Sequence, residues 1–336
     1  MHPRFYKILR SSSLAVILLA MGTVQSFAVT VTWNGAGTNA LWSNATNWGG
    51  TAPNGNDTLI FAGTVGLTNT NNFATGTGAG TNFAIIFQTN AGAFVLNGSN
   101  NNVMALTVGV TNNSTNIQTL NLNIALAGTT NTWSANSNDI VMNGVLSGTT
   151  ALTKSGANDL ILTASNTYSG GTTINQGTIS ISNNAAFGTG AVTFASNSSV
   201  TALTTLNITN AFSIATSVSG TFNVGTGFTM TNAGVISGAG TLVKADVGTL
   251  QLTASNTYSG GTTVNAGTLT LSGSGTLGAT TGALTIGAGT VDLGGLSRTN
   301  GAFTLDTGTL TNGTLTATSY ALTNAGNVYA ILAGSG

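Results

Sequence analysis

One twelve-residue sequence occurs twice in this chain and constrains its fold more than any other feature. LTASNTYSGGTT runs from Leu162 to Thr173 and again, without a change, from Leu252 to Thr263. Self-similarity over such a long separation is typical of proteins built from stacked structural repeats. The residues around both copies should therefore show which unit is stacked.

Each copy lies in a unit of three short strands separated by turns. In the first copy, residues 160–182 alternate between strand-forming stretches and turns that contain glycine. The last strand alternates apolar and polar side chains, so Ile179 and Ile181 face the same side. The second copy has Leu269 and Leu271 at these positions. Inward positions stay aliphatic, which predicts that they line a core.

Short strands with frequent turns fit either a β-sandwich or a β-solenoid. Three observations favour the solenoid: the long-range repeat, an unbroken β-and-turn texture from residue 29 to residue 336, and recurring Asn and Thr at turns, where stacked side chains share hydrogen bonds. We therefore predict an all-β solenoid of parallel strands. With about 20 residues per coil, it would have about fifteen coils.

The N-terminal segment, residues 1–28, has the three-part pattern of a cleaved secretory signal peptide. Residues 1–10 carry basic side chains, residues 14–21 form a short apolar run, and residues 26–28 place small residues at a cleavage site. A buried N-terminal helix is the alternative. No second long apolar run follows, so we expect no transmembrane helix in the mature chain, residues 29–336.

The mature chain has few charges, which excludes several classes of partner. Its cations are Lys154, Lys244 and Arg298, against six aspartates. Three scattered cations cannot neutralise a run of phosphates, so nucleic-acid binding is not expected. Two of these cations, Lys154 and Lys244, stand at the same position of the two repeats.

The chain lacks most side chains used in catalysis. It has no cysteine and no glutamate, and its single histidine lies in the predicted signal peptide. Triads based on His or Cys and His-based metal sites are therefore excluded, and we predict no catalytic, cofactor-binding or metal-binding residue. Gly273–Gly278 matches a dinucleotide-binding glycine pattern, but strands and turns follow it where a phosphate site needs a helix.

Asp292 and Asp306, with Arg298 between them, form the only dense cluster of charges. Two carboxyl groups on neighbouring coils would suit a polysaccharide lyase or hydrolase. The simpler interpretation is that these are solvated charges at turns.

Residues 29–62 are rich in tryptophan and are predicted to cap a β-helix of residues 63–336. Trp33, Trp42 and Trp48 either cover the first coil, which we favour, or form an aromatic platform that binds carbohydrate. At the other end, residues 330–336 resemble residues 234–240, which lead into the second repeat. We therefore expect the full gene to continue beyond this chain.

The repeat resembles a known family. ALTKSGANDLILTASNTYSGGTTINQGTISI (151–181) and TLVKADVGTLQLTASNTYSGGTTVNAGTLTL (241–271) look like autotransporter-associated β-strand repeats, also called passenger-associated transport repeats. This resemblance implies a right-handed parallel β-helix passenger that export machinery carries across the bacterial envelope, with repeats that aid export and folding. The repeat-motif residues are Asn166, Tyr168, Gly170, Gly171, Asn256, Tyr258, Gly260 and Gly261.

Together these observations predict a non-enzymatic, secreted or cell-surface protein with a structural or adhesive role and no cofactor. Its expected partners are host or environmental glycans and surfaces. The first alternative is a carbohydrate-binding adhesin that uses the tryptophan face or the polar Asn/Thr flank, and the second is the polysaccharide lyase or hydrolase described above.

Overall fold

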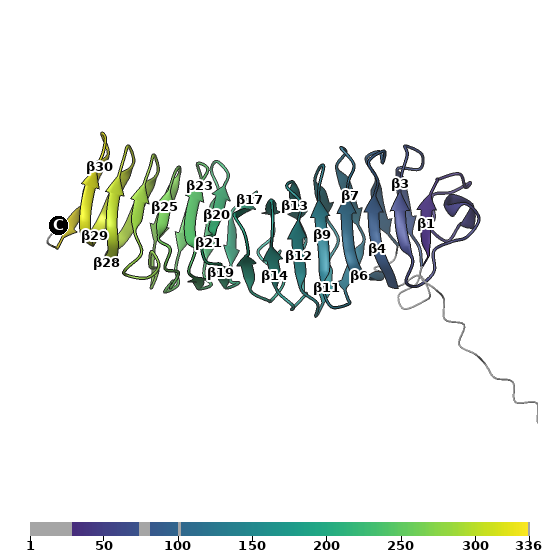
Figure 1. The fold of residues 1–336 in the computed structure, drawn as a ribbon, viewed down its shortest axis with the longest axis horizontal. Coiled ribbons are helices and arrows are strands. Elements are labelled where there is room, and N and C mark those ends of the chain that lie inside the picture. Colours follow the sequence, from purple (N-terminus) through teal and green to yellow (C-terminus); the bar gives the residue numbers. More distant parts are fainter. Residues whose placement is uncertain (1–28, 74–80, 100–101, 335–336) are drawn as a thin grey trace, which may run out of the picture.

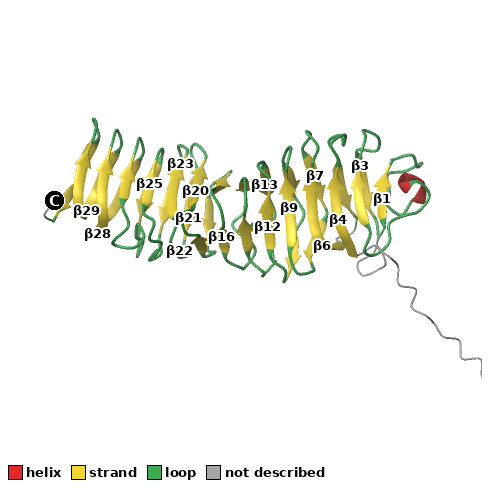
Figure 2. Ribbon diagram, in the orientation of Figure 1, coloured by secondary structure: helices red, strands yellow, loops and turns green. Residues whose placement is uncertain are grey.

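The computed structural model describes residues 29–73, 81–99 and 102–334, so the predicted signal peptide lies outside the described residues. The chain winds into a long rod with strands stacked across its axis, from β1 at one end to β30 at the other (Figure 1). The strand pairings of the described residues are parallel. Their one helical element is a short 3₁₀ helix, η1 (Ala45–Trp48), at the N-terminal end (Figure 2). The predicted all-β parallel solenoid is confirmed.

The strands of successive turns stack in parallel on three faces of the coil, and the strands of each face are here called ladders 1, 2 and 3. Ladder 1 contains β1 (Thr30–Trp33), β2 (Thr58–Phe61), β9 (Asn131–Ala135), β12 (Leu152–Ser155), β14 (Thr172–Ile174), β16 (Val192–Phe194), β19 (Phe212–Ile214) and β22 (Ile236–Gly238). Ladder 2 contains β3 (Thr68–Asn71), β5 (Val95–Gly98), β7 (Gln118–Asn121), β10 (Ile140–Met142), β13 (Asp159–Leu162), β15 (Thr178–Ile181), β17 (Ser198–Ala202), β20 (Ser219–Val224), β23 (Thr241–Ala245), β25 (Thr262–Val264) and β27 (Leu284–Ile286).

Ladder 3 contains β8 (Asn123–Leu126), β11 (Leu146–Gly148), β18 (Leu206–Ile208), β21 (Thr229–Asn232), β24 (Thr249–Leu252) and β26 (Thr268–Leu271). Five longer strands bend from one ladder into the next: β4 (Thr81–Phe87), β6 (Val103–Asn112), β28 (Thr290–Leu305), β29 (Thr309–Leu322) and β30 (Asn327–Ala333).

Ladder 2 gives the number of turns. Its paired strands from β3 to β29 mark twelve turns between Thr68 and Leu322. The predicted count of about fifteen is therefore slightly high. The N-terminal turns are longer than assumed, since Thr30 pairs with Thr58 of the next turn and Thr58 pairs with Ala84 of the turn after it.

The two repeat copies lie on different ladders. From Leu152, four turns along ladder 1 lead through β14, β16 and β19 to Ile236. The residue equivalent to Leu152 in the second copy is Leu242, on β23 of ladder 2, which is the next strand along the chain. The copies are therefore four and one-third turns apart, and the second is rotated by one third of a turn relative to the first.

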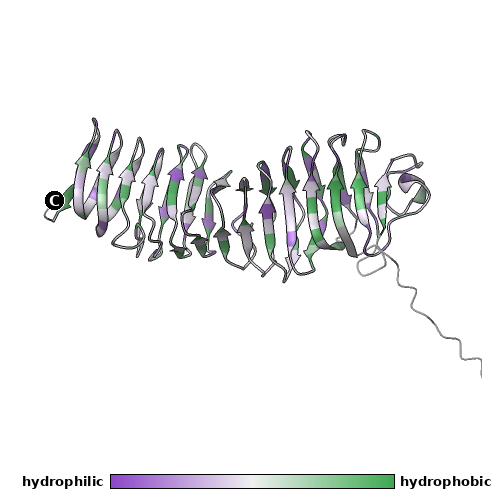
Figure 3. Ribbon diagram, in the orientation of Figure 1, coloured by the Kyte–Doolittle hydropathy of each residue, from purple (hydrophilic) through white to green (hydrophobic). Residues whose placement is uncertain are grey.

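The core is a continuous column of aliphatic and aromatic side chains. Apolar and polar residues alternate along the stacked strands (Figure 3), as period-two strands with one buried face require. Ile179, Ile181, Leu269 and Leu271 are buried, which confirms their predicted inward direction. On ladder 2, the buried side chains of Leu160, Ile179, Val200 and Phe222 follow one another in successive turns, so the core is continuous along the rod.

Candidate functional site

Each repeat copy forms a corner, residues 164–171 in the first copy and 254–261 in the second, that links three turns of the coil. In the first corner, the Asn166 side chain is only 3% exposed. Its Oδ1 accepts a hydrogen bond from the Leu146 N–H of the turn below at 2.8 Å. Its Nδ2 donates to the Ala186 carbonyl of the turn above at 2.6 Å. One amide thus replaces two backbone hydrogen bonds where no strand is present.

The second corner repeats this arrangement. Asn256 Oδ1 accepts from the Ile236 N–H at 2.8 Å, and Asn256 Nδ2 donates to the Thr276 carbonyl at 3.0 Å. Ile236 is the repeat equivalent of Leu146. The corner therefore builds the same contacts on ladder 1 that the first copy builds on ladder 3.

The repeat tyrosines have matching environments, as the duplicated sequence predicts. Tyr168 and Tyr258 are fully buried, and each hydroxyl lies 2.6 Å from a threonine Oγ1, that of Thr172 and Thr262 respectively. Burial raises the pKa of both phenols, while the threonine hydrogen bond partly opposes that rise. Both tyrosines act as neutral members of the core.

The glycine pair of each corner has two separate reasons to be glycine. A Cβ at Gly170 would lie 2.3 Å from the Ala151 backbone nitrogen, and a Cβ at Gly260 would lie 2.5 Å from the Gly240 backbone carbon and oxygen. Gly171 and Gly261 instead have positive φ angles of 80° and 91°, which favour glycine. The first glycine of each pair permits close contact and the second permits the turn.

Lys154 is a buried cation that the sequence did not mark as functional. Its side chain is 0% exposed and points into the core. The ammonium donates to three carbonyl oxygens, those of Ser155, Gly156 and Gln176 at 2.8, 2.7 and 3.1 Å. Burial lowers its pKa from 10.5 to about 8, while the carboxylates of Asp159 and Asp139 raise it.

Lys244 makes the same set of contacts in the second copy. Its ammonium donates to the carbonyls of Ala245, Asp246 and Ala266 at 2.6, 2.6 and 3.4 Å. Burial lowers its pKa to about 8, and Asp246 opposes this shift. The recurrence of lysine at the same repeat position was the signal that could have identified these turn-bridging side chains.

The three N-terminal tryptophans form a buried aromatic cluster. Trp33, Trp42 and Trp48 are 1%, 0% and 5% exposed. Trp48 packs edge-on against Trp33 and Trp42, with ring centroids 5.1 and 5.8 Å apart, and Phe61 contacts all three rings. No ring face is open to a sugar, so the hypothesis of a carbohydrate platform is wrong for these residues. The rings cover the first turns of the coil, which begins within residues 29–62 because β1 and β2 pair there.

The tryptophan indoles are also satisfied within the cluster. Trp42 Nε1 donates to Asn69 Oδ1 at 2.7 Å, Trp48 Nε1 donates to the Trp42 carbonyl at 2.9 Å, and Trp33 Nε1 donates to the Gly66 carbonyl at 3.2 Å. An indole whose N–H is already bonded inside the fold serves packing.

Asp292 and Asp306 have no hydrogen-bond partner in common among the described residues. Asp292 lies on ladder 3 and accepts from the Gly294 N–H at 2.8 Å and from Asn312 Nδ2 at 2.9 Å. Asp306 follows ladder 2 and accepts hydrogen bonds from Thr323 and Asn324. Asp292 thus bonds to one backbone N–H and one side chain, and Asp306 bonds to two side chains of the next turn.

Arg298 does not pair with either carboxylate. Its Nε donates to the Gly275 carbonyl at 2.7 Å and its Nη1 donates to the Ser297 carbonyl at 2.9 Å. Burial lowers its pKa from the ordinary value. Within residues 29–73, 81–99 and 102–334, no group of three or more His, Cys, Asp or Glu side chains could hold a metal ion. The same part of the chain contains no helix with the length and apolar character to cross a membrane.

The polar flank carries the side-chain ladder that the recurring turn residues predict. Asn121 Nδ2 donates to Asn97 Oδ1 and Asn143 Nδ2 donates to Asn121 Oδ1, each at 2.9 Å. Thr163 Oγ1 continues the row to Asn143 Oδ1 at 2.8 Å. These contacts link four successive turns at the surface and confirm the expected stacking.

Comparisons with known proteins agree with this arrangement. The family model of the passenger-associated-transport repeat matches residues 152–181 and 242–271. The curated protein "Adhesin BmaC autotransporter" of Brucella suis biovar 1 (strain 1330) is 36% identical over 136 residues, which cover 40% of this chain and 4% of the adhesin. No solved structure matches this chain significantly. The resemblance seen in the sequence is confirmed, and the matched region is a small part of the relative's length.

Proposed function

We propose that this chain, which carries two passenger-associated transport repeats, is a non-enzymatic, surface-exposed β-solenoid passenger that adheres to other surfaces. The observation that carries the proposal is the 136-residue similarity to an autotransporter adhesin, in a chain that folds as an extended parallel solenoid. A rod of stacked turns exposes a long lateral surface, and solenoids use such surfaces for binding.

The proposal also assigns the two repeats a role in folding after export. Each corner satisfies the backbone groups of the turns above and below through one asparagine, so a newly formed turn gains defined hydrogen bonds to its neighbours. A solenoid folds by adding turns to an existing stack. The two corners would provide stable points for that addition.

Adhesion tests the proposal directly. Fluorescent beads coated with the folded chain should bind cultured epithelial cells or polysaccharide-coated plates more than beads coated with the same chain after heat unfolding. Equal binding of both bead preparations to every surface would contradict an adhesive role.

A second measurement tests localisation. The full chain, expressed in a Gram-negative host, should lose its N-terminal segment and become accessible to protease added to intact cells. Retention of the uncleaved chain in the cytoplasm would contradict the proposed export.

An enzymatic function is the competing candidate. The carboxylates of Asp292 and Asp306 are hydrogen-bonded to separate local partners, which supports the non-enzymatic proposal. Turnover of any polysaccharide, measured as new reducing or unsaturated ends and abolished by Asp306→Asn, would replace it.

A further inference from the structure

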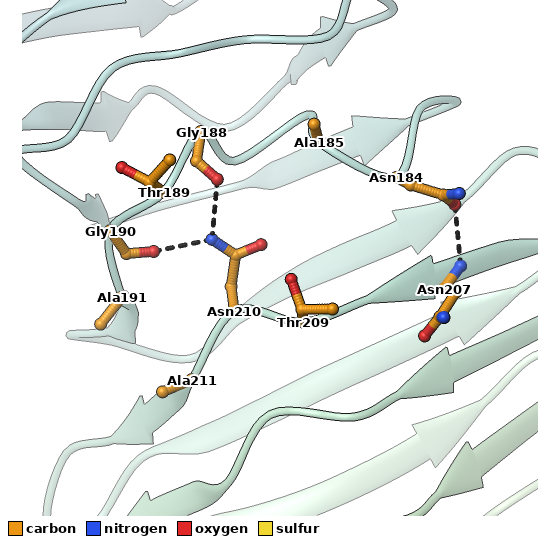
Figure 4. Close-up of a pocket in the computed structure, with 10 residues that line it drawn as sticks. All are labelled: Asn184, Ala185, Gly188, Thr189, Gly190, Ala191, Asn207, Thr209, Asn210 and Ala211. Atoms are coloured by element: carbon orange, nitrogen blue, oxygen red, sulfur yellow. Dashed lines mark hydrogen bonds between the residues drawn. The ribbon is translucent and has the colours of Figure 1, made fainter.

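A groove opens between two successive turns in the middle of the rod. Between β11 and β18, ladder 3 holds the first repeat corner and the loop 183–190 in place of regular strands. One wall of the groove comes from residues 184–185 and 188–191, and the other from residues 207 and 209–211 (Figure 4). Its volume is about 610 Å³, within the usual range of ligand sites.

The groove exists because its first wall, residues 184–185 and 188–191, packs closely against the first repeat corner. A Cβ at Gly188 would lie 2.2 Å from the Tyr168 carbonyl oxygen, and one at Gly190 would lie 2.4 Å from the Gly171 nitrogen. The loop therefore lies flat on the repeat corner. The next turn crosses it with the small side chain of Ala211, which leaves the space between the turns open.

Asn210 has a largely buried side chain whose amide oxygen is still accessible at this groove. Its side chain is 7% exposed, and its Nδ2 donates to the carbonyls of Gly188 and Gly190 at 3.1 and 2.8 Å (Figure 4). Both neighbours are acceptors, so only the amide nitrogen can face them. Asn210 Oδ1 therefore faces away from these carbonyls, and it accepts no hydrogen bond within the described residues.

The other polar groups of the groove are exposed and uncharged. The hydroxyls of Thr189 and Thr209 and the side-chain amide of Asn207 have no hydrogen-bond partner among the described residues. Asn184 Oδ1 is already occupied, since it accepts from the Asn207 N–H at 2.8 Å. None of the lining residues carries a charge or an aromatic ring. The groove therefore offers neutral donors and acceptors next to small apolar surfaces.

We propose that this groove binds a segment of a neutral oligosaccharide. Sugar hydroxyls both donate and accept, which matches an unpartnered amide oxygen, two threonine hydroxyls and a free amide. An anionic glycan would find no cation among these lining residues to offset its loss of hydration. The inference rests on the proposed adhesive function and assigns that function a ligand class and a place.

The second repeat provides a matched control position. The packing of Gly278 on Tyr258 repeats that of Gly188 on Tyr168, with a Cβ-to-oxygen distance of 2.4 Å. Thr299 is exposed, is equivalent to Thr209 and does not line the groove. Its surroundings differ from those of Thr209, because the neighbouring Arg298 donates to the Gly275 carbonyl at 2.7 Å. A hydroxyl lost at Thr299 should leave the groove at residues 184–211 unchanged.

The experiment measures binding of maltohexaose, cellohexaose and chitohexaose to the full chain by isothermal titration calorimetry, with an alginate hexamer as the anionic comparison. We expect at least one neutral hexasaccharide to bind and the alginate hexamer not to bind. Thr189→Val with Thr209→Val should weaken that binding by at least about tenfold, because two hydrogen bonds are lost at nearly constant volume. Thr299→Val should not change it.

A second variant keeps the test independent of the hydroxyls. Ala211→Trp fills the groove from an exposed position and should abolish binding while circular dichroism stays unchanged. Binding of no neutral hexasaccharide, binding unaffected by both groove variants, or binding of an extended peptide in place of a glycan would overturn the inference. If beads coated with Ala211→Trp still adhere like wild type, the adhesive function stands and the groove assignment fails.

Discussion

At the residue scale, two buried polar side chains in each repeat complete the hydrogen bonding of backbone groups that have no strand partner. Asn166 and Asn256 each connect the turn below with the turn above. Lys154 and Lys244 each gather three carbonyl oxygens at the end of an inward-facing stem. Buried polar groups are tolerated when their hydrogen bonds are made, and the cost appears when one partner is removed.

Replacing the corner asparagine tests this account. Asn166→Ala leaves the buried Leu146 N–H and the Ala186 carbonyl without partners, which should lower the free energy of unfolding by about 2–4 kcal/mol. Urea unfolding followed by circular dichroism measures the change. Asn143→Ala is the matched control, because its side-chain hydrogen bonds are exposed, and its effect should stay within about 0.5 kcal/mol. Equal effects of both variants would contradict a structural role of the corner amide.

The buried lysines predict an unusual dependence of stability on pH. Their folded pKa of about 8 lies below the ordinary value of 10.5, so between these pH values the unfolded chain holds protons that the folded chain has released. The free energy of unfolding should therefore rise with pH in this window. Above about pH 10 the raised pKa of Tyr168 and Tyr258 acts in the opposite direction, because only the unfolded phenols ionise.

The measurement is urea unfolding at constant ionic strength across pH 7 to 11. Wild type should show a maximum of stability near pH 10, whereas Lys154→Met combined with Lys244→Met should show no rise above pH 8. The same rise in both proteins would mean that the lysines are not its source.

At the element scale, the repeat corner is a connection whose shape depends on two glycines with different tasks. Gly170 lies where the corner touches the turn below, and Gly171 provides the positive φ angle that leads into β14. In both copies the strand after the corner pairs with the equivalent strand of the previous turn: β14 pairs with β12, and β25 pairs with β23. The first pair belongs to ladder 1 and the second to ladder 2. Local sequence therefore sets the form of the corner independently of the ladder on which it lies.

Close contact and backbone conformation can be separated by two glycine substitutions. Gly170→Ala places a Cβ 2.3 Å from the Ala151 nitrogen, so two turns must separate, at an expected cost of about 3 kcal/mol. Gly227→Ala meets no atom within 4 Å and has only the penalty of a positive φ of 79°, about 1 kcal/mol. Thermal unfolding compares them, and a smaller effect at Gly170 would show that the corner has room to relax.

At the scale of the whole molecule, the rod is a stack in which each turn contacts only the turns above and below. Stability is then a sum over neighbouring turns, and intact turns can be removed if the new neighbours match. The duplicated dodecamer supplies such a match, because both copies stand on equivalent sequences and make equivalent contacts. The offset of four and one-third turns does not disturb this match, since it changes only the face of the coil on which the second copy lies.

Deletion of residues 162–251 joins the two copies through their shared sequence. We expect this protein to fold into a rod shorter by about 21 Å, at about 4.8 Å per turn, with everything after the junction rotated by one third of a turn. Small-angle X-ray scattering measures the length. Deletion of residues 162–206 is the control, because it puts the exposed Asn207 where the buried Leu162 stood, and it should not fold cooperatively. Failure of both deletions would show that the copies are not interchangeable.

The sequence alone determined the strands, their buried faces and the stacking into a parallel solenoid. These depend on short-range features: alternation places Ile179 and Ile181 inside, and glycine pairs mark the corners. It also indicated the match of Tyr168 with Tyr258, because identical residues in identical local structure meet the same neighbours one turn away.

Only the tertiary structure decided which face of the coil each copy occupies and where a groove opens. It also decided that the lysine ammonium groups bind clusters of carbonyl oxygens and that the tryptophan rings are covered. The angular position of the second copy depends on the lengths of all the turns before it, and these differ: the turn from Leu152 to Thr172 is shorter than the turn from Phe212 to Ile236. The sum of these turn lengths cannot be read from any single stretch of sequence. Burial and grooves likewise depend on the side chains of adjacent turns, which are distant in sequence and come into contact only after the coil has formed.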